Sequence, residues 1–210
     1  TFSDYRFELY GCRAQSKNTI LLNGIGVRPE ATSVTRAFEH EGHFGIHVDC
    51  SDCFGTLSNY GADWVNHCSR SFLNLGQGRY LIVDRVRFNN EGQFEARFHT
   101  RAEAEIDEQG IASIDGNSST LKLRTWADEP VTARLGGSAP ISPDQKPDTI
   151  IQIQSEALVE AVTLVTLLEL SESAAALQCE PSEEGLIVRC SGEQLCAIPL
   201  GESGIPFEQL

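Results

Sequence analysis

The sequence lacks methionine altogether, and its 210 residues begin with Thr1 rather than with an initiator. We therefore expect the chain to be a fragment of a longer protein. Long apolar runs are missing as well. The longest candidate, residues 157–170, is short and carries two glutamates, whereas a membrane-spanning helix needs about 20 apolar residues. The sequence predicts no membrane span, and any secretion signal lies upstream or has been removed.

Basic residues are scarce. The sequence has sixteen Lys and Arg residues and thirty Asp and Glu residues, which gives a formal net charge of −14 at pH 7. Charge of this sign repels DNA, RNA and anionic membranes over about a Debye length, so we expect neither nucleic acid nor membrane as a partner. The sequence has no glycine-rich phosphate loop and no G-x-S-x-G turn, so nucleotide chemistry is not indicated. The charge disfavours an acidic polysaccharide unless the basic residues cluster locally.

The seven cysteines are an odd number at irregular spacing, unlike the pattern of a small disulfide-rich domain. Cys190 and Cys196 flank residues 191–193, where a tight hairpin would allow a cross-strand disulfide. Cys50 and Cys53 have the spacing of a pair that can bind zinc or form a redox disulfide. The remaining three are expected to be small buried apolar side chains: Cys12, Cys68 and Cys179.

Alternation of polar and apolar residues, the period of a half-buried strand, dominates the chain. Residues 79–88 and 93–100 show it most clearly, and the Asn-Asn-Glu-Gly segment between them predicts a hairpin that pairs the two strands. Asn23-Gly24 is suited to the positive φ angles of another hairpin turn. Residues 185–190 and 195–200 predict the last hairpin of the chain.

The stretch 149–177 is ambiguous, since its apolar run fits a buried helix by length and propensity, whereas its valines and threonines favour a strand. We favour a strand because the neighbouring segments offer edges with which it can pair. Residues 136–148 hold three prolines with Gly and Ser and predict a surface loop. Short strands separated by turn residues predict an all-β, multistranded antiparallel β-sandwich, which forms one domain over residues 1–210.

Three stretches, in this order, carry a family resemblance. Residues 16–26 read Ser-Lys-Asn-Thr-Ile-Leu-Leu-Asn-Gly-Ile-Gly, and residues 46–51 read Ile-His-Val-Asp-Cys-Ser. The third begins with Ser-Arg-Ser-Phe-Leu at 69–73 and continues through 80–86 and 98–100. Together they resemble the carboxy-terminal β-sandwich of heparinase II/III-like polysaccharide lyases, alginate lyases included, a supersandwich-like fold.

The resemblance implies a secreted or periplasmic lyase that cleaves uronic-acid polysaccharide, a glycosaminoglycan or alginate, by β-elimination. A base then removes the proton α to the carboxylate, and an acid assists the leaving oxygen. In that family a helical toroid supplies most catalytic residues, so we expect a missing N-terminal toroid as partner and assign no catalytic residue here. Where many members have histidine, this chain has Lys17 before Asn18. A lysine can neutralise a carboxylate but is a poor acid-base group at neutral pH.

Metal-binding side chains are concentrated between positions 40 and 67. His47 and Asp49 are two residues apart and would share one face of a strand. Some heparinase II/III-type proteins hold a metal in this sandwich with His and Asp ligands. The predicted ligands of a divalent ion, Zn, Ca or Mn, are therefore His47, Asp49 and His67. The alternative is that these side chains lie on a solvated face while Cys50 and Cys53 fill the other.

Five of the sixteen basic residues fall in or beside the predicted hairpin, where rows of arginine would bind carboxylates or sulfates in bidentate fashion. The alternative is that they pair with glutamates on neighbouring strands. The five are Arg79, Arg85, Arg87, Arg97 and Arg101. The predicted substrate-binding residues are Lys17, Asn18, Arg85, Arg97 and His99.

These observations predict the β-sandwich part of a heparinase II/III-type lyase, which lines the cleft for an acidic polysaccharide, with or without a metal. The alternative is a non-catalytic carbohydrate-binding or structural β-sandwich, which the charge of −14 favours if the ligand is neutral. A third hypothesis is a cupin-like metalloenzyme built on the histidine cluster.

Overall fold

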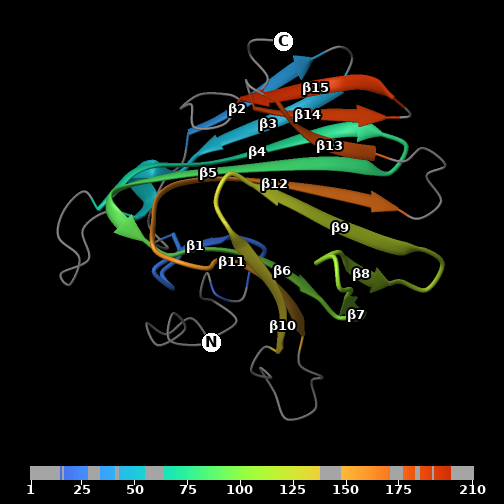
Figure 1. Ribbon diagram of the computed structural model, residues 1–210, viewed down its shortest axis with the longest axis horizontal. Coiled ribbons are helices and arrows are strands. Elements are labelled where there is room, and N and C mark those ends of the chain that lie inside the picture. Colours follow the sequence, from blue (N-terminus) through green and yellow to red (C-terminus); the bar gives the residue numbers. More distant parts are fainter. Residues whose placement is uncertain are drawn as a thin grey trace, which may run out of the picture.

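The structure of the chain, a computed structural model, consists of strands in three antiparallel sheets (Figure 1). The all-β, multistranded antiparallel sandwich expected from the alternation is therefore confirmed. The structure describes residues 15, 17–27, 34–40, 43–54, 64–137, 148–170, 177–182, 185–190 and 192–199. Over these ranges no helix is long and apolar enough to cross a membrane.

Eight strands form the largest sheet, in the order β2-β3-β4-β5-β12-β9-β8-β7. Its central strands are buried on both faces, and in β5 every residue from Leu81 to Val86 is buried. Such a strand reads as a continuous apolar run with few polar interruptions. The strands are β2 (Val34–His40), β3 (His43–Asp49), β4 (Val65–Gly76), β5 (Arg79–Gly92), β12 (Val159–Leu170), β9 (Thr120–Ala127), β8 (Ala112–Asp115) and β7 (Glu103–Ile106).

A four-stranded sheet, in the order β1-β6-β11-β10, packs against one face of the eight-stranded sheet, which we call the inner face. Phe94, Ala96 and Phe98 alternate into this interface and belong to one apolar core with Ile82 and Leu164 of the large sheet. The strands are β1 (Ile20–Leu22), β6 (Phe94–Thr100), β11 (Thr149–Ser155) and β10 (Val131–Gly137).

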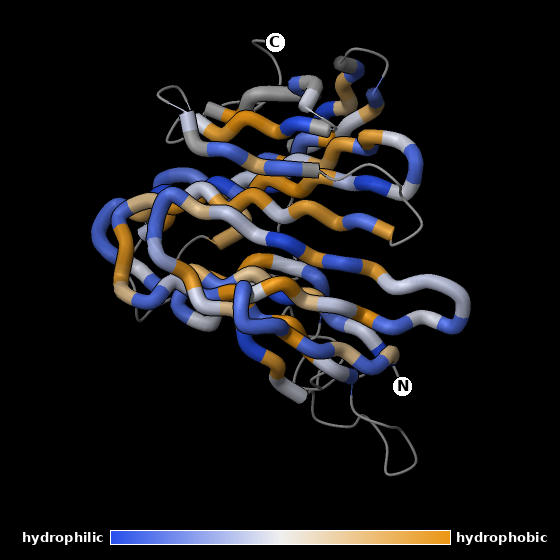
Figure 2. Tube along the Cα trace, turned by 45° about the vertical axis from the view of Figure 1, so that its right-hand side comes forward, coloured by the Kyte–Doolittle hydropathy of each residue, from blue (hydrophilic) through white to orange (hydrophobic). Residues whose placement is uncertain are grey.

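A three-stranded sheet, in the order β13-β14-β15, packs on the opposite, outer face of the large sheet. Leu81 and Val83 form a second core there with Leu186, Val188 and Ile198. In Figure 2 hydrophobic segments run along the stacked strands of the sheets. The strands are β13 (Leu177–Ser182), β14 (Gly185–Cys190) and β15 (Glu193–Pro199).

The predicted hairpin between residues 79–88 and 93–100 is wrong. β5 continues through the expected turn to Gly92 and pairs with β4 and β12, whereas β6 pairs with β1 and β11 in the other sheet. The chain passes from one sheet to the other at this point. The Phe88 ring lies where a side chain of Gly92 would begin, since a Cβ built there is 2.4 Å from the ring. Burial on two faces, rather than proximity along the chain, determines the partners of β5.

Other local predictions are confirmed. Asn23 and Gly24 have φ of 50° and 75°, and Leu22 and Ile25 exchange backbone hydrogen bonds around them. The ambiguous stretch supplies the strands β11 and β12, and the last hairpin is β14 with β15. The predicted loop 136–148 is wrong at its start, because β10 extends to Gly137; residues 138–147 lie outside the described ranges.

The cysteine predictions have mixed outcomes. Cys68 is fully buried, as expected, whereas Cys179 is only partly buried. Cys12 and the side chains of Cys190 and Cys196 lie outside what the structure describes.

Candidate functional site

An apolar groove lies on the inner face of the large sheet, lined mainly by β3, β4 and β5, with Phe98 of the small sheet beside it. Ile46 pairs with Phe72, and Phe72 with Ile82, so alternation places their side chains on one face. The floor carries exposed apolar side chains, with Phe44 68%, Ile46 47%, Phe72 40% and Tyr80 45% exposed. Such a concentration of exposed apolar surface is typical of a binding site. The groove has a volume of about 570 Å³.

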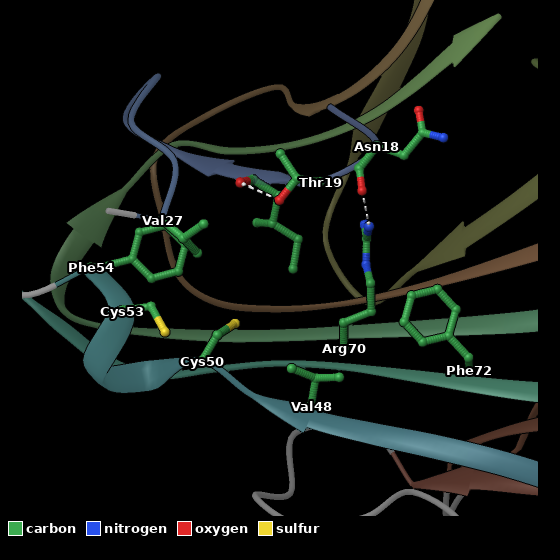
Figure 3. Close-up of a pocket in the computed structure, with 10 residues that line it drawn as sticks. Asn18, Thr19, Val27, Val48, Cys50, Cys53, Phe54, Arg70 and Phe72 are labelled. Carbon is green, nitrogen blue, oxygen red and sulfur yellow. Dashed lines mark hydrogen bonds between the residues drawn. The ribbon is translucent and has the colours of Figure 1, made fainter. Parts of the chain in front are cut away.

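A second, smaller cavity of about 260 Å³ adjoins the groove (Figure 3). Asn18, Arg70 and Phe72 line both. The rest of its lining comes from the segment around β1 and from the end of β3 with the following 3-10 helix, Ser51–Phe54. These other residues are Thr19, Ile20, Val27, Val48, Cys50, Cys53 and Phe54.

Arg70 joins the two sheets at the boundary between groove and cavity. Its Nε donates to Asp84 Oδ1 at 2.5 Å and its Nη2 to Oδ2 at 2.8 Å, while Nη1 donates to the Asn18 carbonyl at 3.1 Å. The rings of Phe72 and Phe98 each lie 6.0 Å from the guanidinium carbon. Burial lowers the pKa of Arg70, but the Asp84 carboxylate raises it more. The Asp84 carboxylate thus balances the charge of the Arg70 guanidinium within the fold. The bond from Arg70 to the Asn18 carbonyl holds the segment that leads into β1.

Of the predicted substrate-binding residues, Asn18 lines the groove, and Lys17 is the residue before it in the chain. Both are exposed. The Asn18 side-chain oxygen accepts a hydrogen bond of 2.6 Å from the His99 backbone N–H. This contact and the bond from Arg70 fix the position of Asn18.

Arg97 and His99 lie on the other side of β6. Because Phe94, Ala96 and Phe98 point into the core, the alternate residues point away from the groove. Arg97 donates to Glu95 Oε1 at 2.6 Å and to the Gln15 carbonyl at 2.9 Å. Burial lowers the pKa of His99, while the Asp148 carboxylate opposes this.

Arg85 and the predicted metal ligands lie on the outer face of the large sheet, beside its second core. His47 pairs with Ser71, Asp49 with Ser69, and Ser69 with Arg85, which places these side chains in neighbouring rows. Arg85 is 3% exposed. The large sheet therefore separates Arg85 from the groove.

Serine hydroxyls contact the three predicted ligands. His47 Nδ1 lies 2.8 Å from Ser71 Oγ, and His67 Nε2 lies 2.9 Å from Ser69 Oγ. Ser51 Oγ donates to Asp49 at 2.6 Å. His47 is only 6% exposed, so the alternative of a solvated face is wrong for this residue.

The electrostatics of this cluster follow from burial. Burial lowers the pKa of both His47 and His67, and the Asp49 carboxylate only partly offsets this. Burial raises the pKa of Asp49, but the hydrogen bonds from Ser51, with a smaller electrostatic contribution from His67 and His47, lower it overall. At pH 7 the imidazoles of His47 and His67 are therefore neutral and the Asp49 carboxyl group is ionised.

The described side chains do not form a metal site of three or more His, Cys, Asp or Glu ligands. His47, Asp49 and His67 are accordingly not arranged as such a site, and we derive no chemistry from a metal. The prediction of a bound Zn, Ca or Mn ion stays a prediction, which elemental analysis of the protein would test.

The five arginines of the predicted stripe are divided between sheets. Arg85 and Arg87 lie on the large sheet and Arg97 on the small one. The alternative of ion pairs with glutamates on neighbouring strands does not hold for Arg97, whose partner Glu95 lies on the same strand, or for Arg101, which pairs with Asp148 at 3.5 Å. The stripe fails because it depended on the hairpin.

Sequence reasoning assigned no role to Arg70 or to the aromatic floor. A signal for the ion pair was present, since Arg70 and Asp84 are opposite charges in two apolar segments, where an isolated charge would be costly. The floor had no such signal, because Phe72 and Tyr80 alternate as core residues do.

No protein-family model matches the chain, and no curated protein matches its sequence. Solved structures do match its fold. Heparan sulfate lyase HepC from Pedobacter heparinus superposes with a TM-score of 0.67 at 10% identity, over 98% of this chain and 34% of that chain. Two heparinase III structures superpose with TM-scores of 0.63 at 16% identity, one over 91% of this chain and 30% of its own, the other over 84% and 29%.

At such identities the likeness shows the fold, and the fold expected from the motifs is thereby confirmed. The chain spans about a third of the length of the structures it matches.

Proposed function

We propose that the chain is the β-sandwich part of a polysaccharide lyase that cleaves uronic-acid polysaccharide by β-elimination, and that the apolar groove is one wall of its substrate cleft. The carrying observation is the open aromatic floor on a fold shared with heparan sulfate lyase and heparinase III structures. On this proposal the protein acts outside the cytoplasm, secreted or periplasmic, where such polymers occur.

The chemistry of the groove suits sugar rings. The C–H face of a pyranose stacks on the flat apolar surface of an aromatic ring, and Phe44, Phe72 and Tyr80 offer such surfaces. Asn18 offers an amide, held by its bond to the His99 backbone, for hydroxyl or carboxylate groups of the sugar. Few placed polar groups on an apolar wall are the usual composition of a ligand site.

The groove does not hold a complete set of catalytic groups among its described lining. β-Elimination needs a base and an acid. Among the described lining residues, Tyr80 is the only one whose type of side chain can serve as an acid or a base, since an arginine such as Arg70 stays protonated. The proposal therefore assigns binding to this chain and the remaining acid-base groups to a helical toroid domain outside it.

Binding by the 210-residue chain tests the proposal. We expect oligosaccharides of heparan sulfate or alginate to bind, measured by calorimetry, and Phe72→Ala or Tyr80→Ala to weaken binding about fivefold, since a lost stacking contact costs about 1 kcal/mol. Leu158→Ala is the matched control, because Leu158 is 57% exposed and does not line the groove. Binding unaffected by both groove substitutions would contradict the proposal.

A lyase assay provides the complementary test. Elimination creates an unsaturated uronate that absorbs in the ultraviolet, and the absorbance should stay flat for this chain alone. A rise would show that the chain holds the catalytic groups itself.

The second candidate is a carbohydrate-binding sandwich without catalytic parts, which takes a neutral polysaccharide. The net charge of −14 and the internal neutralisation of Arg70 favour it. Stronger binding of neutral than of uronic-acid oligosaccharides of equal length would decide for this alternative.

A further inference from the structure

Three cysteine side chains are gathered where β3 ends and β4 begins. The Cys50 N–H donates to the Cys68 carbonyl at 2.8 Å, directly beyond the pairing of Asp49 with Ser69. The Cys50 Sγ lies 3.5 Å from the Cys68 Sγ. Cys53 follows on the 3-10 helix, where its N–H donates to the Cys50 carbonyl. Cys50 and Cys68 are free thiols.

The two members of the close pair differ in access. Cys68 is fully buried, whereas Cys50 is only partly buried and lines the smaller cavity (Figure 3). A reagent of small size therefore reaches Cys50 first. Cys68 then stands directly behind it, on the neighbouring strand.

We propose that Cys50 and Cys68 form a thiol–disulfide exchange site, which small-molecule disulfides of the glutathione type oxidise to a cross-strand disulfide. This goes beyond the proposed lyase function and does not depend on it. The Cys50 thiolate attacks one sulfur of the small disulfide, forms a mixed disulfide and releases one thiol. The Cys68 thiolate then attacks the Cys50 sulfur and releases the second thiol, so two protein thiols are oxidised while one small disulfide is reduced to two thiols.

The geometry suits the second step. Directly opposed residues on antiparallel strands have Cα atoms about 4.5–5.5 Å apart, within the range of about 4.4–6.8 Å found for disulfides. The sulfur atoms must approach from 3.5 Å to bonding distance, about 2.0 Å. Rotation of the cysteine side chains is the movement by which this gap would close.

Cys68 is the partner of Cys50 in spite of the Cys-x-x-Cys spacing of Cys50 and Cys53. The Cys50 Sγ is directed toward β4, where it contacts both the Cys68 sulfur and the Cys68 carbonyl, at 3.5 Å and 3.3 Å. Cys53 is 3% exposed and belongs to the inner core with Phe54. Sequence spacing alone favours the other pair, so the two assignments are distinguishable.

The experiment uses the reduced chain exposed to oxidised glutathione under native conditions. A protease that cleaves before aspartate separates the three cysteines, because Asp49, Asp52 and Asp63 precede them in turn and give peptides 49–51, 52–62 and 63–83. We expect mass spectrometry to find 49–51 linked to 63–83. A link between 49–51 and 52–62, or Cys50 left as the mixed disulfide, would overturn the proposal.

Single substitutions sharpen the test. Cys53→Ser should leave the link intact, Cys50→Ser should abolish it, and Cys68→Ala should trap Cys50 with glutathione attached. Because a disulfide across this loop restricts the unfolded chain, oxidation should raise Tm by up to about 10 °C in the unsubstituted chain and in Cys53→Ser. Cys179, which packs against the outer core, should stay reduced and serves as the internal control. No Tm difference between the reduced and oxidised chain would count against the proposal.

Discussion

At the scale of single residues, the Arg70–Asp84 ion pair is the interaction with the largest expected energetic consequence. Asp84 is 0% exposed and accepts two charge-assisted hydrogen bonds. Asp84→Asn leaves the guanidinium buried without a countercharge, which costs about 3–5 kcal/mol. Urea unfolding measures the change. The control is Arg101→Met, which removes a pair whose arginine side chain is 82% exposed and is expected to cost under about 1 kcal/mol. Equal effects of the two substitutions would contradict the prediction.

Three histidines, of which His47 is buried and His67 and His99 are partly buried, predict how stability depends on pH. Burial lowers the pKa of His47, His67 and His99 below 6.5, so the folded state binds protons more weakly than the unfolded state. Their contribution is therefore complete above pH 6.5 and is lost as the pH falls through the folded-state values. Asp49, whose pKa is also lowered, adds a loss only below about pH 3.8.

Unfolding free energies measured from about pH 8 to pH 5 test this prediction. They should be flat at the upper end and fall below pH 6.5, and His99→Gln should make the fall shallower. Stability that rises as the pH drops over that range would show that the histidines gain, rather than lose, protons on folding.

At the scale of secondary-structure elements, the corner between β5 and β6 depends on Gly92. A Cβ there would lie 2.4 Å from the Phe88 ring, which is 5% exposed and stacked on Trp64 with centroids 6.2 Å apart. Gly92→Ala should therefore destabilise by about 1–3 kcal/mol, the cost of overpacking. Gly137→Ala on β10 is the matched control, since nothing lies within 4 Å of its added Cβ. Thermal unfolding compares the two, and an equal change in Tm would exclude the corner as the cause.

The same corner shows how far the sequence predicts the elements. The alternation of polar and apolar residues located the strands, and Asn23-Gly24 located the turn, because both features depend on neighbours in the chain. The pairing of strands does not depend on such neighbours. Val83 of β5 is opposite Val165 of β12, and a strand buried on both faces carries no local signal for so distant a partner. Proximity in the chain therefore favoured the wrong partner, β6.

At the scale of the whole molecule, the candidate site was predictable only in part, because the pairing of distant strands has no local signal in the sequence. Of the predicted substrate-binding residues, Asn18 lines the groove, whereas Arg85 and Arg97 lie on faces that only the pairing of the sheets defines. The aromatic floor exists because the assembled sheets leave Phe72 and Tyr80 40% and 45% exposed. The extent of one sheet relative to another is a property of the assembled fold.

The net charge of −14 predicts an unusual salt dependence for the groove. A site that binds polyanions through Lys and Arg loses affinity as the salt concentration rises. Binding releases the cations that surround the polyanion, and this release is less favourable when the solution already contains more salt. Here the floor is apolar and Arg70 is paired, so the main effect of salt is to screen long-range repulsion. Uronic-acid oligosaccharides should therefore bind more tightly at about 0.5 M than at about 0.05 M salt, by calorimetry. Neutral oligosaccharides of the same length, the matched control, should change little. Affinity that falls steadily with salt would instead show that cationic side chains dominate binding.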